Sequence, residues 1–250
     1  MGLSRRLNWY RSRFQVNNPV VGRVVELFGN RVRMDGLTYS VDCPQISTPH
    51  KSTLAFGLHE IDERTLIGRW LPSDVPVLEF GGGLGVVSCL VNSKLDEPEN
   101  HIVVEANPAM VTILQRNRRI NGCKFQVVSK AISYGCDHVD LNVDEQFVGS
   151  SVKGMSSGKT VRVETTSVTD LLIHGGFANA GIVCDIEGSE ADIIRRELPA
   201  LGDRIRFFMT EMHPKILGQQ VVNDLMADLT ELGFMLKEQI GDSVFYIREP

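Results

Sequence analysis

A glycine-rich turn between two acidic residues is the part of the chain best suited to chemistry. The apolar run that contains Glu79 is followed by glycines at positions 81, 82, 83 and 85, after which an apolar segment resumes. This pattern predicts a buried strand, a tight turn and the start of a helix, a layout that brings a ligand against bare backbone. The next apolar run, residues 101–105, ends in a second acid, Glu105.

The two acids indicate which ligand the turn would hold. Glu79, two positions before the first turn glycine, would repel a phosphate but accept hydrogen bonds from an amine. Glu105, at the end of the next strand, can accept hydrogen bonds from both hydroxyls of a ribose. These features predict an S-adenosylmethionine site. The alternative is a nicotinamide-dinucleotide site, whose fingerprint requires a glycine at the position of Val86.

Two further acidic clusters follow later strands. One contains Asp185, Glu187 and Glu190, and the other contains Glu211 and His213. Because ligands of open parallel sheets bind outside the carboxyl ends of the strands, we expect both clusters beside the glycine turn. Glu187 and Glu190 also suit the first turn of a helix, where acids complement the helix dipole. His213 alone would serve as a strand-end cap, but strand periodicity puts it on the same face as Glu211.

Strand and helix patterns alternate from Val75 onward, which predicts an α/β fold with a doubly wound, mostly parallel sheet. We expect strands at 75–80, 101–105, 124–128, 181–186 and 204–211, and helices at 84–94, 108–120, 188–198 and 216–232. Two short strands in the tail, at 233–236 and 243–248, predict the antiparallel closing strand typical of methyltransferases. An insertion with extended segments at 138–143 and 160–168 encloses a loop rich in glycine and serine.

The first part of the chain has a different character. Residues 1–22 carry four arginines and no acid, which suits either an arm packed on the body or an anionic surface. Residues 20–42 alternate apolar and polar side chains around two turn signals, so we expect two or three short antiparallel strands. Residues 58–70 suit a helix. We therefore expect residues 1–74 to form an N-terminal extension and residues 75–250 to form one class I methyltransferase domain.

These motifs resemble the FkbM-type methyltransferases in order and spacing, over roughly residues 55 to 235. The D-x-E-G-x-E element that begins at Asp185 is the most specific part of the resemblance. It implies transfer of a methyl group from S-adenosylmethionine to a hydroxyl of a sugar, polyketide or related metabolite. The matching positions for cofactor binding are Glu60, Glu79, Gly81, Gly83, Gly85, Glu105, Ala106, Asn107, Ser129, Ala131 and Asp185. Ser150 and Ser151 also match, whereas the family's lysine near Val183 is missing.

Catalysis is expected at Asp185, Glu211 and His213. In one mechanism His213 is the general base that takes the proton of the acceptor hydroxyl, and Glu211 orients it. In the other, all three bind a divalent metal that acidifies the hydroxyl directly. Two other classes remain open, a dinucleotide-binding oxidoreductase and a non-catalytic binding protein that retains the fold.

Composition limits the partners. The net charge of −5 argues against a broad surface for nucleic acid. Five cysteines without C-x-x-C spacing suit a reducing compartment. No apolar run approaches the ~20 residues of a membrane-spanning helix, and the N-terminus lacks the apolar core of a signal peptide. We therefore expect a cytoplasmic protein that acts on a small hydroxyl acceptor, free or part of a glycan or lipid-linked molecule.

Overall fold

The computed structural model describes residues 16–143 and 159–248 and has a parallel sheet at its centre. The strands of this sheet are β3 (Val77–Phe80), β4 (His101–Val104), β5 (Gln126–Val128), β9 (Ala180–Cys184), β10 (Ile205–Glu211), β11 (Met235–Ile240) and β12 (Ser243–Ile247). Their order across the sheet is β11-β12-β10-β9-β3-β4-β5. All five strands expected between residues 75 and 211 are thus confirmed, with ends that differ by at most two residues.

The closing strand distinguishes this sheet from a dinucleotide fold. Neighbouring strands from β10 to β5 run parallel, whereas β12 is antiparallel to both β10 and β11. A dinucleotide fold instead continues from its fifth to its sixth strand without an antiparallel strand between them. The α/β, doubly wound sheet with an antiparallel closing strand is therefore confirmed.

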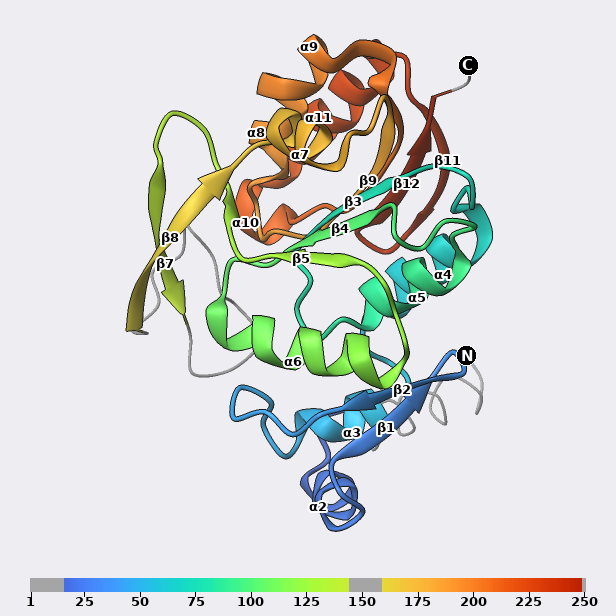
Figure 1. The fold of residues 1–250 in the computed structure, drawn as a ribbon, viewed down its shortest axis with the longest axis vertical. Helices are drawn as coiled ribbons and strands as arrows, with labels where there is room; N and C mark the ends of the chain where they lie inside the picture. The colour runs from blue at the N-terminus through green and yellow to red at the C-terminus, as the bar shows by residue number, and fades with distance from the viewer. Residues whose placement is uncertain (1–15, 144–158, 249–250) are drawn as a thin grey trace, which may run out of the picture.

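Helices cover both faces of the sheet (Figure 1). One face carries α4 (Ile61–Trp70), α5 (Val86–Lys94) and α6 (Pro108–Ile120). The other carries α7 (Val168–Gly175), α8 (Glu190–Asp192), a π-helix (Ile193–Glu197), α9 (Leu198–Leu201), α10 (Pro214–Leu217) and α11 (Gln219–Glu231). Alternation along β3 serves both layers, since Leu78 packs with Ile193 and Leu225 while Val77 packs with Leu66. Burial on both faces explains why these strands are continuous apolar runs.

The N-terminal segment packs beneath α6 (Figure 1). It comprises α2 (Pro19–Leu27), β1 (Arg31–Met34), β2 (Leu37–Ser40) and α3 (His50–Ala55). The hairpin of β1 and β2 is confirmed, with Asp35 and Gly36 at φ 51° and 81° in its turn. Asn117 of α6 fixes it, because its Oδ1 accepts from Ser40 N at 2.7 Å and its Nδ2 donates to Ser40 O at 3.1 Å.

The strand expected from residue 20 is wrong, because this stretch is the helix α2. Asn18 caps it by accepting from Val20 N and Val21 N, and Pro19 occupies the first turn. These start signals outweigh the alternation of side chains that follows them. The helix expected from residue 58 begins at Ile61. The extended segment expected over residues 160–168 ends earlier, because α7 begins at Val168. The division of the chain at residue 75 stays a prediction, and the basic arm over residues 1–14 lies outside the described residues.

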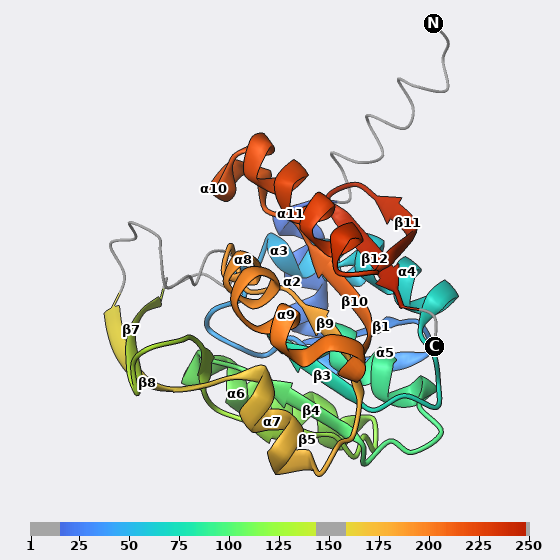
Figure 2. The same cartoon turned by 90° about the horizontal axis from the view of Figure 1, so that it is seen from above.

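The insertion forms a small sheet at the side of the molecule (Figures 1 and 2). Its strands are β6 (Ala131–Ile132), β7 (His138–Val143) and β8 (Lys159–Thr166), in the order β6-β8-β7. The glycine- and serine-rich loop that joins β7 to β8, with Ser150 and Ser151, lies outside the described residues. Among the described helices, none has the length and apolar character needed to cross a membrane.

Candidate functional site

A cavity opens at the carboxyl ends of β3, β4 and β9. Its volume is about 850 Å³ when the space at its mouth is included. The residues expected to bind a cofactor that line it are Glu60, Gly81, Gly83, Glu105, Ala106, Asn107, Ala131 and Asp185. Sequence positions up to 125 residues apart therefore meet at one place, as the parallel sheet requires.

The glycine turn is held against both neighbouring strands. Gly81 N and Gly82 N donate to Val104 O at 2.9 and 3.3 Å. Gly81 has φ 90°, and a Cβ atom there would lie 1.9 Å from Asp185 O. Gly83 also has a positive φ, of 48°. A side chain at Gly81 would therefore both strain the backbone and separate β3 from β9.

Glu105 is fixed at the wall of the cavity. Its Oε2 accepts from Gly83 N at 2.7 Å, and its Oε1 accepts from Asn107 N at 2.7 Å. The side chain is largely buried, and this burial raises the pKa of the carboxyl although both backbone N–H groups oppose the shift. Each oxygen retains a second lone pair, so Glu105 can still accept from hydroxyls of a ligand.

Glu79, which was expected to bind the amine of a ligand, has partners within the protein. It is 1% exposed, so the protein encloses its side chain. The hydroxyl of Ser88 donates to its Oε1, and His101 Nε2 lies 3.1 Å from its Oε2. Both oxygens thus have partners from α5 and β4, so contact with the amine of a ligand would require one of these bonds to be exchanged. The acid instead links the strand to the helix that follows the turn.

Two other expected cofactor residues also lie outside the wall of this cavity. Gly85 begins α5 with φ 81°, and a Cβ atom there would lie 2.8 Å from Leu114 Cδ1, so close packing explains this glycine. Ser129 is exposed. Sequence reasoning missed Lys130, Ile132 and other wall residues, since apolar residues of a site look like core residues in a sequence.

A second cavity adjoins the first and is strongly acidic. It measures about 1040 Å³ with its open space, and Glu60, Asp185 and Glu187 line both cavities. Its carboxylates are Glu60, Asp62, Glu63, Asp185, Glu187, Glu211 and Asp242, and its histidines are His50 and His59. Glu63 was not predicted, although its spacing of three from Glu60 puts both on one side of a helix.

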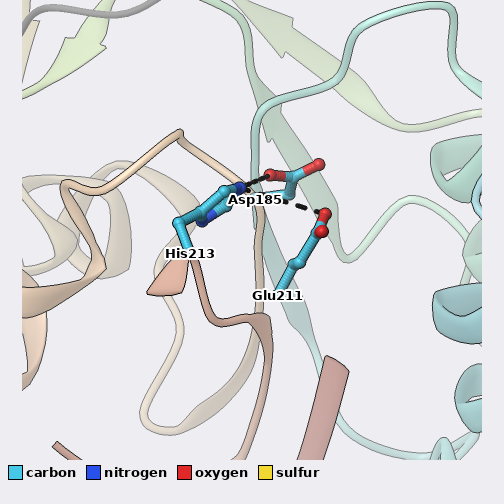
Figure 3. Close-up of side chains that lie close together, drawn as sticks. All are labelled: Asp185, Glu211 and His213. Carbon is cyan, nitrogen blue, oxygen red and sulfur yellow. Dashed lines mark ion pairs between the residues drawn. The ribbon is translucent and has the colours of Figure 1, made fainter. Parts of the chain in front are cut away.

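Asp185, Glu211 and His213 come together at the edge of this second cavity (Figure 3). His213 Nε2 lies 3.3 Å from Asp185 Oδ1 and 3.9 Å from Glu211 Oε2. Glu187 Oε2 is 3.6 Å from the same nitrogen. On the other side of the ring, His213 Nδ1 lies 3.3 Å from Oε1 of the buried Glu190. The clusters after β9 and β10 are therefore neighbours, as expected of adjacent strands.

The close packing of acidic side chains around His213 shifts the pKa values of His213 and Glu211. Burial lowers the pKa of His213, but its contacts with Asp185 and Glu190 outweigh burial and raise the pKa to about 11. Burial, followed by the charges of Asp185 and Glu63, raises the pKa of Glu211 to about 8. Without a ligand, His213 therefore carries a proton at neutral pH, and the arrangement holds it as a cation among carboxylates.

No protein-family model matches the chain, and no curated protein sequence matches it. A methyltransferase from Pyrococcus furiosus is 14% identical, with 96% of this chain and 98% of that one covered and a TM-score of 0.46. TYW2 of M. jannaschii, solved in complex with AdoMet, is 11% identical over 88% of this chain and 86% of that one, with a TM-score of 0.45.

Fibrillarin from Aeropyrum pernix, with natively bound S-adenosyl-L-methionine, is 11% identical over 75% and 74% of the chains, with a TM-score of 0.45. All three TM-scores are below 0.5. None of these likenesses identifies a function for this chain, so its function must be inferred from its own residues.

Proposed function

We propose that this protein is an S-adenosylmethionine-dependent methyltransferase that modifies a hydroxyl of a small molecule, in the manner of the FkbM-type enzymes. The cavity beside the glycine turn carries the proposal, because its wall combines bare backbone, a fixed carboxylate and apolar side chains. Bare backbone at Gly81 and Gly83 admits a ligand, and Glu105 suits a ribose diol. Met110 and Ile132 offer an apolar surface of the kind that an adenine ring requires.

When bound, S-adenosylmethionine supplies a methyl group that is already activated by a sulfonium. The chain must therefore mainly hold and orient the acceptor, which is worth up to ~7–11 kcal/mol. We assign the acceptor to the acidic cavity, since it shares Glu60, Asp185 and Glu187 with the proposed cofactor cavity. Asp185, Glu211 and His213 stand at this junction and are proposed to act on the acceptor hydroxyl.

The charge of the second cavity limits the acceptor. The described residues that line it include seven acidic side chains and neither lysine nor arginine. An acceptor with a phosphate or carboxylate would meet like charges at short range. We therefore propose a neutral polyhydroxylated acceptor, or one that carries an amine, and not an anionic one.

Titration calorimetry tests the cofactor. We expect binding of S-adenosylmethionine and S-adenosylhomocysteine and no binding of NAD. Gly83→Val should abolish this binding, because Gly83 lines the cavity and has φ 48°. Tight NAD binding without a response to either sulfur nucleoside would assign the chain to the oxidoreductase alternative.

Radiolabelled methyl transfer tests the activity on pools of neutral, amine-bearing and anionic metabolites. We expect label in the neutral or amine-bearing pools. Binding of the cofactor without transfer to any pool would favour the alternative of a non-catalytic binding protein.

A further inference from the structure

The carboxylates around His213 are arranged as a set of ligands as well as a set of charges. Each of Asp185, Glu211 and His213 offers one ligand atom, and these atoms all lie within 4.8 Å of one another. Ligand atoms at about 2.1–2.3 Å from one divalent ion are roughly 3–4.5 Å apart, depending on the coordination angle. The separations of 3.3 Å from Asp185 Oδ1 to His213 Nε2 and of 3.9 Å from Glu211 Oε2 to the same nitrogen are within that range.

The histidine is also held as a ligating histidine would be. Its side chain is 10% exposed, and its Nε2 faces Asp185 and Glu211 (Figure 3). Glu190, which is fully buried, stands 3.3 Å from the opposite nitrogen, Nδ1. Glu190 is itself fixed, since its Oε1 accepts from Ile186 N at 3.0 Å. The contact of Glu190 with Nδ1 lacks hydrogen-bond geometry, but the carboxylate stands on the side of the ring where a metal-bound imidazole usually has its supporting carboxylate.

Unsatisfied polar atoms form a second, independent indication. Within residues 16–143 and 159–248, Asp185 Oδ1, Glu190 Oε2 and His213 Nδ1 are buried and lack a hydrogen-bond partner. Buried polar groups usually find one, so such a group needs an explanation. The ion pairs that surround His213 do not satisfy these atoms. A bound cation would be a direct partner for the oxygen of Asp185.

We propose that Asp185, Glu211 and His213 bind one divalent cation at the edge of the acidic cavity. Two hard oxygens and one imidazole suit Mn²⁺ or Fe²⁺ better than Mg²⁺. Because Asp185 and Glu211 also line the acidic cavity, the ion would face an acceptor hydroxyl there and lower its pKa. This role rests on the proposed function, whereas the metal site itself does not.

Manganese binding to the full-length protein tests the site. After treatment with a chelator and its removal, the protein is titrated with Mn²⁺, and bound ion is followed by electron paramagnetic resonance. We expect one ion per chain and an electron spin-echo modulation from an imidazole nitrogen. Asp185→Asn, Glu211→Gln and His213→Ala should each weaken Mn²⁺ at least tenfold. Asp62→Asn removes a charge from the same cavity outside the cluster and should retain the stoichiometry.

The wild-type spectrum makes the test independent of whether the variants fold. Absence of Mn²⁺ binding by the wild type would overturn the site, as would saturable binding without the nitrogen modulation. Equal Mn²⁺ affinity of Asp62→Asn and the three cluster variants, when all are folded, would also overturn it. Calorimetry with S-adenosylmethionine in EDTA is run in parallel. If S-adenosylmethionine binds in EDTA, the proposed function stands even when no Mn²⁺ site is found. If S-adenosylmethionine does not bind, the proposed function is refuted, whereas the metal site is judged by the Mn²⁺ titration alone.

Discussion

At the scale of single residues, substitutions of Glu105 and His213 should distinguish cofactor binding from catalysis. Glu105 accepts from two backbone N–H groups and lines the cavity beside the glycine turn. Glu105→Gln replaces one acceptor oxygen by an amide donor, so binding of S-adenosylmethionine should weaken about 10- to 100-fold. This factor corresponds to the ~1.5–3 kcal/mol that a hydrogen bond to a charged group contributes. Calorimetry measures this, with the exposed Glu97→Gln as the matched control. Equal affinity of both variants would remove Glu105 from the site.

His213 should show the opposite behaviour. It lies at the junction of the cavities but does not line the proposed cofactor cavity. His213→Ala should therefore leave the affinity for S-adenosylmethionine within a few-fold and lower turnover on an identified acceptor by at least about tenfold, because the proposed cation would lose a ligand. Single-turnover transfer of the labelled methyl group measures the second effect. Unchanged turnover in His213→Ala, and likewise in Asp185→Asn and Glu211→Gln, would place catalysis elsewhere.

The sequence was informative at these positions for a physical reason. Acids at the ends of apolar strands conflict with burial, so Glu105, Asp185 and Glu211 stand out in their surroundings. Glu79 stands out in the same way, yet the structure gives it internal partners in Ser88 and His101. A sequence shows that a buried acid needs a partner but not whether this partner belongs to the protein or to a ligand.

At the scale of elements, Glu26 joins α2 to the start of α3. Its Oε1 accepts from Thr48 Oγ1 at 2.6 Å and from Lys51 Nζ at 2.9 Å. The bond from Thr48, then that from Lys51, lowers the pKa of Glu26 from 4.5 to about 2. A lowered carboxyl pKa stabilises the fold above the unfolded value, and this contribution is lost as the pH falls through the folded value.

Glu26→Gln should therefore lower the melting temperature at pH 7, with a difference from the wild type that shrinks as the pH falls below about 4.5. Thermal unfolding between pH 7 and 3.5 measures it. Glu99→Gln is the matched control, because Glu99 pairs with Lys124 on an exposed surface and should have little effect. A pH-independent difference for Glu26→Gln would show that ionisation of this carboxyl contributes no stability.

The packing between β9 and β10 gives a second prediction at this scale. A Cβ atom on Gly181 would lie 1.8 Å from Cε1 of the buried Phe207. Gly181→Ala should destabilise the protein by about 1–3 kcal/mol or more, as overpacking does. The exposed Gly68 of α4 has no such neighbour within 4 Å, and Gly68→Ala should stabilise by up to about 1 kcal/mol. Urea unfolding compares the two, and equal stability of both variants would contradict the packing.

The elements also show where a sequence is a poor guide. The central strands were predicted well because burial on both faces makes each an uninterrupted apolar run. The helix α2 was not, since its start depends on Asn18 and Pro19 while its side chains alternate like those of a strand. The π-helix at 193–197 was predicted as ordinary helix, because its altered bonding leaves no separate mark on the pattern of apolar residues.

At the scale of the whole molecule, charge should exclude nucleic acid. The net charge is −5, and carboxylates line the cavity assigned to the acceptor. Fluorescence anisotropy with labelled single-stranded RNA and DNA at 0.15 M salt, near physiological ionic strength, should show no binding. Salt-dependent binding that disappears when residues 1–14 are deleted would instead make the basic arm a site for polyanions.

The order of strands across the sheet has a consequence for synthesis of the chain. β3 lies beside β9, although about a hundred residues of sequence separate them, and β12 lies between β10 and β11. Contacts so distant in sequence form slowly, because the loop between them must close first. During translation, the glycine turn is made early but lacks the wall that Asp185 supplies until β9 emerges. The nascent chain should therefore acquire ligand affinity late and abruptly, and a chaperone that delays collapse would favour correct insertion of β12.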